Sequence, residues 1–306
     1  MTAKITVIGS INIDLVARSH HIPRTGETVL GGDFQTIPGG KGANQAVAAA
    51  RMGGYVTMVG RVGSDAFSAL LMENLATAGI DTTFVKKDED APSGVALIMV
   101  DELGQNSILV ASGANSRLSP VDVDLAEKAV LSADVILLQL ETPLGTALRA
   151  ASLGKQNGVK VILNPAPAYP LPHEIYPLVD YLIPNETEAK MLTGQSLEED
   201  SGVEAAANIL LSMGANNVII TLGNRGSLLA TRLGTFVVPP FAVHPIDTTA
   251  AGDAFVGCFA VALAEGKALG EAVRWGNAAG ALATTRKGAQ PSLPQREEVI
   301  RLLGQI

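Results

Sequence analysis

Short runs of β-branched and apolar residues alternate with longer stretches of helical periodicity along most of the chain. The runs predict strands at Ile5–Ile8, Tyr55–Val59, Asp134–Leu140, Val159–Leu163, Val179–Ile183 and Asn217–Leu222. The periodic stretches predict helices at Gly42–Met52, Asp65–Ala78, Pro120–Leu131 and Val203–Met213. This alternation is typical of an α/β fold with a large, mostly parallel sheet and helices on both faces.

Two regions break the alternation, residues 14–38 and 93–111, and both are typical of hairpins in a small accessory sheet. Their extended runs are Thr28–Leu30, Asp33–Ile37, Gly94–Val100 and Ser107–Ala111. Gly94–Val100 reads GVALIMV without polar alternation, which indicates that both of its faces are covered. A partner subunit would supply the second cover in an outlying sheet. A central strand of the main sheet is the alternative.

The composition indicates one compact, soluble domain over residues 1–306. Hydrophobic residues make up 47% and charged residues 17%, and no linker or internal repeat divides the chain. The net charge of −8 argues against nucleic acid as a partner, and no basic run suggests a membrane. We expect a cytoplasmic protein, because no apolar run suits a signal peptide or a membrane span. The single cysteine, Cys258, excludes an intrachain disulfide, and we expect it to be buried.

The segment Asp247–Phe255, DTTAAGDAF, carries the strongest chemical signal. Ala250, Ala251 and Gly252 are small and precede Asp253, after which an apolar helical pattern begins. A helix that starts with small residues leaves its free N–H groups open to an anion, and a first-turn carboxylate can accept a proton from a hydroxyl. Phosphoryl transfer to an alcohol requires both features. The alternative is that Asp253 only favours the helix start.

Other polar residues follow the predicted strands, at the edge where open α/β sheets bind ligands. Asn12 and Asp14 follow the first strand, and Glu141 follows Asp134–Leu140. The segment PGGKGANQA places Lys41 among glycines before a helix, so that backbone and ammonium can approach a polyhydroxyl ligand or a phosphate. It is not a nucleotide P-loop, and a glycine-rich helix entry without a ligand is the alternative.

Two more turns are candidates for a nucleotide site. Asn185–Glu188, NETE, would place Asn185 near phosphate and Glu188 in the water shell of magnesium, or the two residues form a plain capping pair. Thr221–Gly226, TLGNRG, borders a nucleotide or is an ordinary loop. The chain lacks a G-x-G-x-x-G start, a G-x-S-x-G elbow and metal-like histidine spacing. These gaps argue against a dinucleotide oxidoreductase, an α/β-hydrolase and a histidine metal site.

Together these motifs resemble the ribokinase-like (PfkB-type) carbohydrate kinases over essentially the full length. The matching pieces are GSINIDL, PGGKGANQA, VGRVGSDAF, LNPAPA, PNETEA, ITLGNRG, DTTAAGDAF and RKGAQPS. The resemblance implies one α/β domain with a small β lid from about residues 14–38 and 93–111, which packs against its copy in a homodimer. It also implies ATP-dependent phosphorylation of D-ribose at its primary hydroxyl. A kinase for 2-deoxyribose or a nucleoside and a non-catalytic sugar sensor are the alternatives.

The resemblance also assigns the acceptor and catalytic residues by motif position. Asp253 is implied as the base that takes the proton of the primary hydroxyl, while backbone groups of Ala250, Ala251 and Gly252 steady the charge on the transferred phosphoryl. The residues implied to hold the sugar hydroxyls are Asn12, Asp14, Gly40, Lys41, Gly42, Asn44, Glu141 and Asp253.

The nucleotide and metal residues follow in the same way. ATP is implied to lie against Asn185, Thr221, Gly223, Asn224, Gly226, Gly252 and Asn277. Many family members carry His where this chain has Asn277, which leaves the nucleotide preference open. A potassium-type cation is implied near Asp247, Thr249, Ala283, Arg286, Gly288 and Ser292, mostly through backbone oxygens. Mg²⁺ is implied near Glu188 through water.

Overall fold

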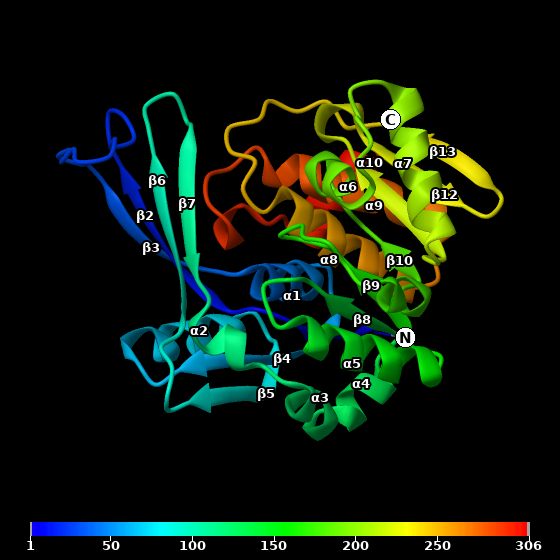
Figure 1. Ribbon diagram of the computed structural model, residues 1–306, viewed down its shortest axis with the longest axis horizontal. Coiled ribbons are helices and arrows are strands. Elements are labelled where there is room, and N and C mark those ends of the chain that lie inside the picture. Colours follow the sequence, from blue (N-terminus) through cyan, green and yellow to red (C-terminus); the bar gives the residue numbers. More distant parts are fainter. Residues whose placement is uncertain (1, 305–306) are drawn as a thin grey trace.

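The computed structural model describes residues 2–304 and contains a nine-stranded sheet flanked by helices and a separate four-stranded sheet (Figure 1). The large sheet consists of β1 (Lys4–Ile8), β4 (Tyr55–Gly63), β5 (Asp81–Asp88), β8 (Val135–Leu138), β9 (Lys160–Leu163), β10 (Tyr181–Leu182), β11 (Asn217–Thr221), β12 (Ser227–Thr231) and β13 (Gly234–Val238). The small sheet consists of β2 (Asn12–Arg18), β3 (Phe34–Gly39), β6 (Gly94–Val100) and β7 (Asn106–Ala111).

The helices are α1 (Lys41–Arg51), α2 (Ala66–Thr77), α3 (Pro120–Leu125), α4 (Glu127–Ser132), α5 (Leu144–Gln156), α6 (Glu186–Thr193), α7 (Asp200–Ser212), α8 (Ala251–Ala264), α9 (Leu269–Ala283) and α10 (Arg296–Leu303). None of them within residues 2–304 is long and apolar enough to span a bilayer. Together with the mainly parallel large sheet they confirm the predicted α/β fold.

The strand order places a topological switch point at β1. The large sheet runs β13-β12-β11-β10-β9-β8-β1-β4-β5, and β1 pairs in parallel with β4 on one side and β8 on the other. After β1, the next strands of the large sheet in the sequence, β4 and β5, lie on one side of it. The later strands β8 to β13 lie in sequence order on the other side. A crevice opens at the carboxyl ends of the strands where the order reverses, and ligands of α/β proteins bind there.

The central strands are apolar throughout because each one faces two cores. In β1, Ile5 and Val7 point into the core formed with α1, α8 and α9, whereas Ile8 points into the core on the opposite face. In β8, Leu137 and Leu138 divide in the same way. Since side chains alternate along a strand, continuous apolar runs are what a sheet covered on both faces requires.

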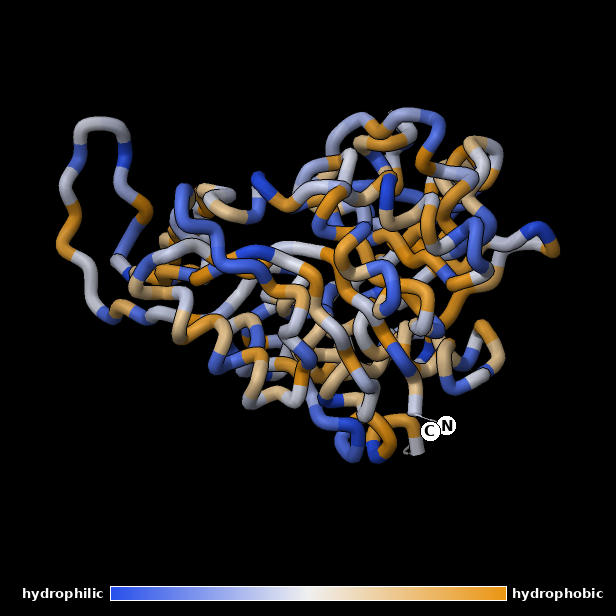
Figure 2. The backbone as a smooth tube through the Cα atoms, turned by 90° about the horizontal axis from the view of Figure 1, so that it is seen from below, coloured by the Kyte–Doolittle hydropathy of each residue, from blue (hydrophilic) through white to orange (hydrophobic). Residues whose placement is uncertain are grey.

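The small sheet projects from one side of the body, and Figure 2 shows the same projection from below. Its order is β3-β2-β6-β7, so residues far apart in the chain lie side by side. Leu97 and Leu109 are opposite each other in the β6–β7 pair and are 45% and 66% exposed. GVALIMV therefore lies in the outlying sheet, and one chain leaves part of it uncovered.

Several local predictions differ from the structure. Thr28–Leu30 is not a strand, because residues 19–33 form a long connection in which this run meets no partner strand. Pro120–Leu131 is not one helix but two short ones, which meet at Ala126. The edge strand β5 and the antiparallel pair β12 and β13 were not predicted. β5 and β13 are partly exposed and lack the continuous apolar run of the central strands, whereas β12 is buried at four of its five positions.

Candidate active site

The Asp253 carboxylate lies in the first turn of α8 and is buried among amide side chains. Its Oδ2 atom accepts a hydrogen bond from Asn44 Nδ2 at 3.0 Å, and its Oδ1 atom accepts one from Gln45 Nε2 at 3.0 Å. Burial raises the pKa of Asp253, whereas Lys41, Asn44 and Gln45 oppose that rise. Both donors come from α1, which packs directly against α8.

The start of α8 is shaped to receive a ligand. Ala250 has a left-handed φ of 58°, which is uncommon for a residue with a Cβ atom and costs roughly 1 kcal/mol or more. Gly252 is exposed, and a Cβ atom added there would meet no protein atom within 4 Å. Packing within the chain therefore does not demand a glycine at residue 252. A residue without a side chain there leaves the helix N–H groups open to the cavity.

The Lys41 ammonium is the main positive charge of the site. Burial opposes this charge, but Asp253, Glu141 and Glu188 together outweigh burial and raise the pKa of Lys41 above its ordinary value. Gly40 precedes Lys41 with a φ of 87°, a conformation that favours glycine. Glu141 Oε2 accepts hydrogen bonds from the Lys41 backbone N–H at 3.0 Å and from Ser10 Oγ at 2.6 Å, so Glu141 is fixed at the start of α1.

Asp14 and Asn12 reach the site from β2 of the small sheet. Asp14 accepts no hydrogen bond from residues 2–304, and burial with repulsion from Glu141 and Asp253 raises its pKa to about 7. A Cβ atom at Gly39 would lie 2.3 Å from the Asp14 carboxylate, so β3 leaves the room that this side chain occupies. Asn12 Oδ1 accepts from Asn115 Nδ2 at 2.6 Å, which fixes the Asn12 amide.

A cavity of about 200 Å³ lies beside Asp253. It is lined by Lys41, Asn164, Ala166, Ile183, Asn185, Glu188, Thr221, Thr248, Ala250, Gly252, Asp253 and Val256. Asn185 and Glu188 form the capping pair that starts α6, with Glu188 Oε2 accepting from the Asn185 backbone N–H at 2.8 Å. Both residues also line the cavity, so the capping and ligand interpretations are compatible at this position.

Of the other predicted nucleotide residues, Thr221 and Gly252 line this cavity, whereas Gly223, Asn224, Gly226 and Asn277 do not. Gly223 and Asn224 are exposed in the turn after β11. Gly226 is buried, and a Cβ atom there would meet the Val238 carbonyl oxygen at 2.3 Å. Asn277 on α9 donates to the Val238 and Pro239 carbonyls at 3.1 Å. Gly226 and Asn277 are thus brought together at the end of β13, where they hold the chain that leads toward α8.

The residues predicted to hold a monovalent cation come from two segments, residues 247–249 and residues 283–292, which hydrogen bonds join in the structure. Asp247 Oδ2 accepts from the Gly288 N–H at 2.9 Å, and the Thr284 carbonyl accepts from the Asp247 N–H at 3.1 Å. The carbonyl groups of Arg286 and Gly288 accept no hydrogen bond from residues 2–304. Arg286 itself pairs with Glu298, and Ser292 Oγ donates to the Ala289 carbonyl at 2.7 Å. Ala283 is buried at the end of α9.

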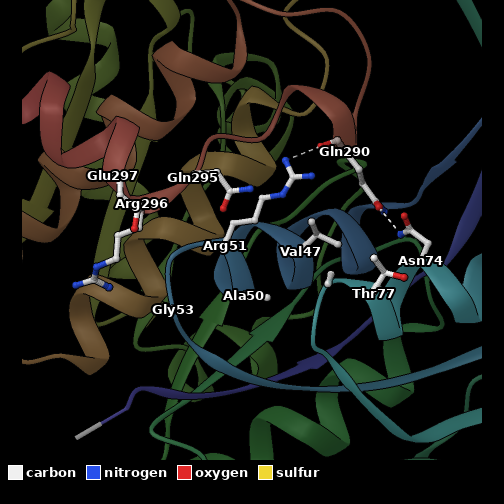
Figure 3. A pocket seen from close by; sticks show the side chains of 11 residues that line it. Val47, Ala50, Arg51, Gly53, Asn74, Thr77, Gln290, Gln295, Arg296 and Glu297 are labelled. Carbon is white, nitrogen blue, oxygen red and sulfur yellow. Dashed lines mark hydrogen bonds between the residues drawn. The ribbon is translucent and has the colours of Figure 1, made fainter.

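A second cavity, of about 450 Å³, lies behind this segment between α1, α2 and the start of α10 (Figure 3). The Arg51 guanidinium donates to the Gln290 carbonyl at 3.0 Å and also to the Leu293 carbonyl. The Gln290 side-chain oxygen accepts from Asn74 Nδ2 at 2.6 Å (Figure 3). These contacts tie the loop after α9 to the same helix that carries Lys41.

Four polar residues of the site were not singled out from the sequence. Gln45, Gln139 and Asn164 form a buried amide cluster beside Asp253, and Asn115 holds Asn12. Gln45 lies in PGGKGANQA and Asn164 in LNPAPA, so both motifs were noted as wholes. Cys258, in contrast, is buried as predicted and donates from its Sγ atom to the Trp275 carbonyl.

Comparison with known proteins places this geometry in context. The family model for pfkB family carbohydrate kinases matches residues 2–296. A protein of Haemophilus influenzae named ribokinase is 44% identical over 303 residues, which are 99% of each chain. A protein of Salmonella typhi named deoxyribokinase is 42% identical over 295 residues, which are 96% of each chain. A solved ribokinase of Arabidopsis thaliana complexed with ribose and ATP has a TM-score of 0.93, 36% identity and 99% coverage of each chain.

Proposed function

Because the chain belongs to the pfkB family of carbohydrate kinases, we propose that it transfers the terminal phosphoryl group of ATP to the primary hydroxyl of D-ribose. The observation that carries this proposal is that Asp253 and the open start of α8 line one cavity. The ribokinases among its relatives, one of them complexed with ribose and ATP, support the choice of both substrates. Since the reaction consumes ATP, we place it in the cytoplasm.

In the proposed reaction Asp253 accepts the proton of the primary hydroxyl as its oxygen attacks phosphorus. The new O–P bond forms while the bond from phosphorus to the departing ADP oxygen breaks. Backbone groups of Ala250, Ala251 and Gly252 would steady the charge on the moving phosphoryl, and the Lys41 ammonium, which lines the same cavity, would lie beside it. Because the transition state is loose, positioning and charge stabilisation supply most of the acceleration.

The sugar is proposed to lie between the two sheets. Asn44 Oδ1 is buried without a hydrogen-bond donor, and the Asp14 carboxylate also has none within residues 2–304. Sugar hydroxyls are donors and would satisfy both acceptors, which supports a polyhydroxyl substrate at this position. Asn12, Gly40, Lys41, Gly42 and Glu141 border the same space in this proposal.

Two cations are proposed to assist. Mg²⁺ would arrive with ATP and lie on the Asn185 and Glu188 side of the cavity, where it would neutralise phosphate charge. A potassium-type ion would be held by oxygens of Asp247, Thr249, Ala283, Arg286, Gly288 and Ser292. Oxygen ligands suit such an ion, and the unpaired carbonyls of Arg286 and Gly288 support the site. Its charge would steady the start of α8.

The small sheet is proposed to act as a lid that dimerises with its copy in a second chain. Leu97 and Leu109 lie on the sheet face opposite to Asp14, and their exposure in one chain would be removed by a second copy. Sedimentation should show a dimer at micromolar concentration, and Leu109→Arg should shift it to monomer. A wild-type chain that sediments as a monomer would contradict this part of the proposal.

The test of the substrate is ADP release across ribose, 2-deoxyribose, hexoses and nucleosides, with the product identified by phosphorus NMR. Ribose should give the highest kcat/KM. A sugar that lacks one hydroxyl leaves a buried acceptor unpaired, which costs a few kcal/mol at most. The deoxyribokinase relative makes 2-deoxyribose the main competitor. A higher kcat/KM for 2-deoxyribose would change the assigned substrate from ribose to that sugar. No ADP release with any acceptor would refute the proposed reaction.

A further inference from the structure

Three amide side chains form a directed chain of hydrogen bonds that ends on Asp253. Asn164 Nδ2 donates to the Ile183 carbonyl at 2.9 Å, so Asn164 Oδ1 is free to accept from Gln45 Nε2 at 3.0 Å. Gln45 Oε1 accepts from Gln139 Nε2 at 2.7 Å. Because the Ile183 carbonyl can only accept, it fixes which end of the Asn164 amide faces it. The Asn164 oxygen then fixes the orientation of the Gln45 amide, and the Gln45 oxygen fixes that of Gln139. The second N–H of Gln45 must therefore point to Asp253 Oδ1.

Gln45 reaches the reaction only through this contact. Its side chain is completely buried and is not part of the lining of the cavity at Asp253. Its neighbour Asn44 donates to the other carboxylate oxygen, but Asn44 also has an unpaired buried oxygen at the proposed sugar position. A substitution of Asn44 therefore disturbs two roles, whereas a substitution of Gln45 disturbs one.

We propose that Gln45 is a positioning residue for the base, which fixes the Asp253 carboxylate toward the attacking hydroxyl and favours its ionised form. Gln139 and Asn164 hold Gln45 in the orientation that donates. This inference rests on the proposed phosphoryl transfer and deepens it. Because a base must be ionised before it can accept a proton, the loss of one donor should slow the chemical step without weakening substrate binding.

The acids around Asp253 favour its protonated form, so the hydrogen bond from Gln45 is needed to favour the carboxylate. Lys41 on α1 favours the carboxylate form, whereas Glu141 after β8, Asp14 on β2 and Glu188 on α6 are acids grouped near it. Burial adds to the preference for the protonated form. A neutral amide donor stabilises the carboxylate without adding a charge that would attract ATP phosphates.

The test is a double-mutant cycle between Gln45→Met and Asp253→Asn, measured by steady-state kinetics and by single-turnover phosphoryl transfer with enzyme in excess. Gln45→Met should lower kcat roughly 10–100-fold and change the KM values for ribose and ATP by less than about twofold. In the Asp253→Asn background the same change should cause no further loss. A full multiplicative loss in that background would overturn the proposal.

Gln139→Met is the matched control, because Gln139 belongs to the amide cluster but does not contact Asp253. In a plot of kcat against pH, the acid limb should move to higher pH in Gln45→Met. The same limb should move by a smaller amount in Gln139→Met. If kcat fell equally in both variants and at every pH, the amide cluster would serve only packing. That result would also overturn the proposal. If Gln45→Met does not fold by circular dichroism, Gln45→Glu keeps the volume. It should move the acid limb further upward, since it adds a carboxyl group beside Asp253.

The two proposals fail in different ways. A wild-type protein that releases no ADP with any sugar contradicts the phosphoryl transfer itself. An active wild-type protein in which Gln45 and Asp253 act independently contradicts only the positioning role.

Discussion

The large sheet and the small sheet each bring one buried carboxylate to the site, and the two are held differently. Asp253, beside the large sheet, accepts from two amides, while Asp14, on the small sheet, accepts no hydrogen bond from residues 2–304. Burial raises the pKa of both, but amides and Lys41 oppose the rise only for Asp253. One carboxylate is held by hydrogen bonds within the chain, and the other accepts none within residues 2–304.

We propose that this difference assigns the chemical step to Asp253 and sugar recognition to Asp14. A preorganised carboxylate costs no reorganisation when the proton moves, which suits a base. A carboxylate without donors gains most when a hydroxyl group binds, which suits recognition of a sugar.

The largest expected effect comes from removal of the preorganised carboxylate. Asp253→Asn should lower kcat by about 10²–10⁴-fold, since the general base is lost, while nucleotide affinity stays nearly unchanged. Steady-state kinetics and equilibrium binding of ATP measure the two quantities. Wild-type turnover in this variant would refute the assignment of the base.

The next effect comes from the Lys41 ammonium, which supports the carboxylate of Asp253. Lys41→Ala leaves Asp253, Glu141 and Glu188 without their shared positive charge. The KM for the sugar should rise by roughly 10²-fold, because uncompensated buried charges are costly. Lys41→Arg is the control that keeps the charge. An unchanged sugar KM in Lys41→Ala would remove Lys41 from the site.

Loss of the carboxylate without donors should affect binding rather than turnover. Asp14→Asn should raise the ribose KM by roughly 10–100-fold with little change in kcat, because a hydrogen bond to a charged group is lost. The changes in ribose KM and in kcat should be compared between Asp14→Asn and Asp253→Asn. If recognition and chemistry are separate, the first variant changes mainly KM and the second mainly kcat. A loss confined to kcat in Asp14→Asn would break the comparison.

The same variant should alter stability with a sign set by the pKa of Asp14. The folded pKa of about 7 exceeds the ordinary value of 3.8, so between these values the folded protein keeps a proton that the unfolded chain has released. Stability should therefore fall as pH rises from about 4 to 7. Asp14→Asn should remove this loss, worth about 2–4 kcal/mol, and should melt higher than wild type at pH 8 in calorimetry without ligand. A lower melting temperature would contradict the raised pKa.

The smallest expected effect comes from the proposed monovalent cation site. Replacing K⁺ by Na⁺ should reduce kcat severalfold, because the segments around Asp247 and Gly288 adjoin the start of α8. The ribose KM should hardly change. Equal activity in the two salts would count against the monovalent cation site.

Much of the architecture was predictable from local patterns. The central strands are apolar without interruption because both faces are covered, and that pattern placed β1, β8, β9 and β11 within a few residues. Edge elements such as β5 and β13 have one exposed face and weaker patterns, so they were missed. The motifs around Lys41 and Asp253 marked the site, because small residues before a helix have a direct chemical meaning.

The sequence by itself determined the fold class, the base candidate and the glycines that admit a ligand, because these depend on neighbouring residues. Only the tertiary structure decided which amides face Asp253 and that no residue between 2 and 304 donates a hydrogen bond to Asp14. Gln45, Gln139 and Asn164 are separated by up to 119 residues and meet only where parallel strands end together. The protonation of a buried carboxylate is set by such distant neighbours through desolvation and hydrogen bonding, and no local pattern records them.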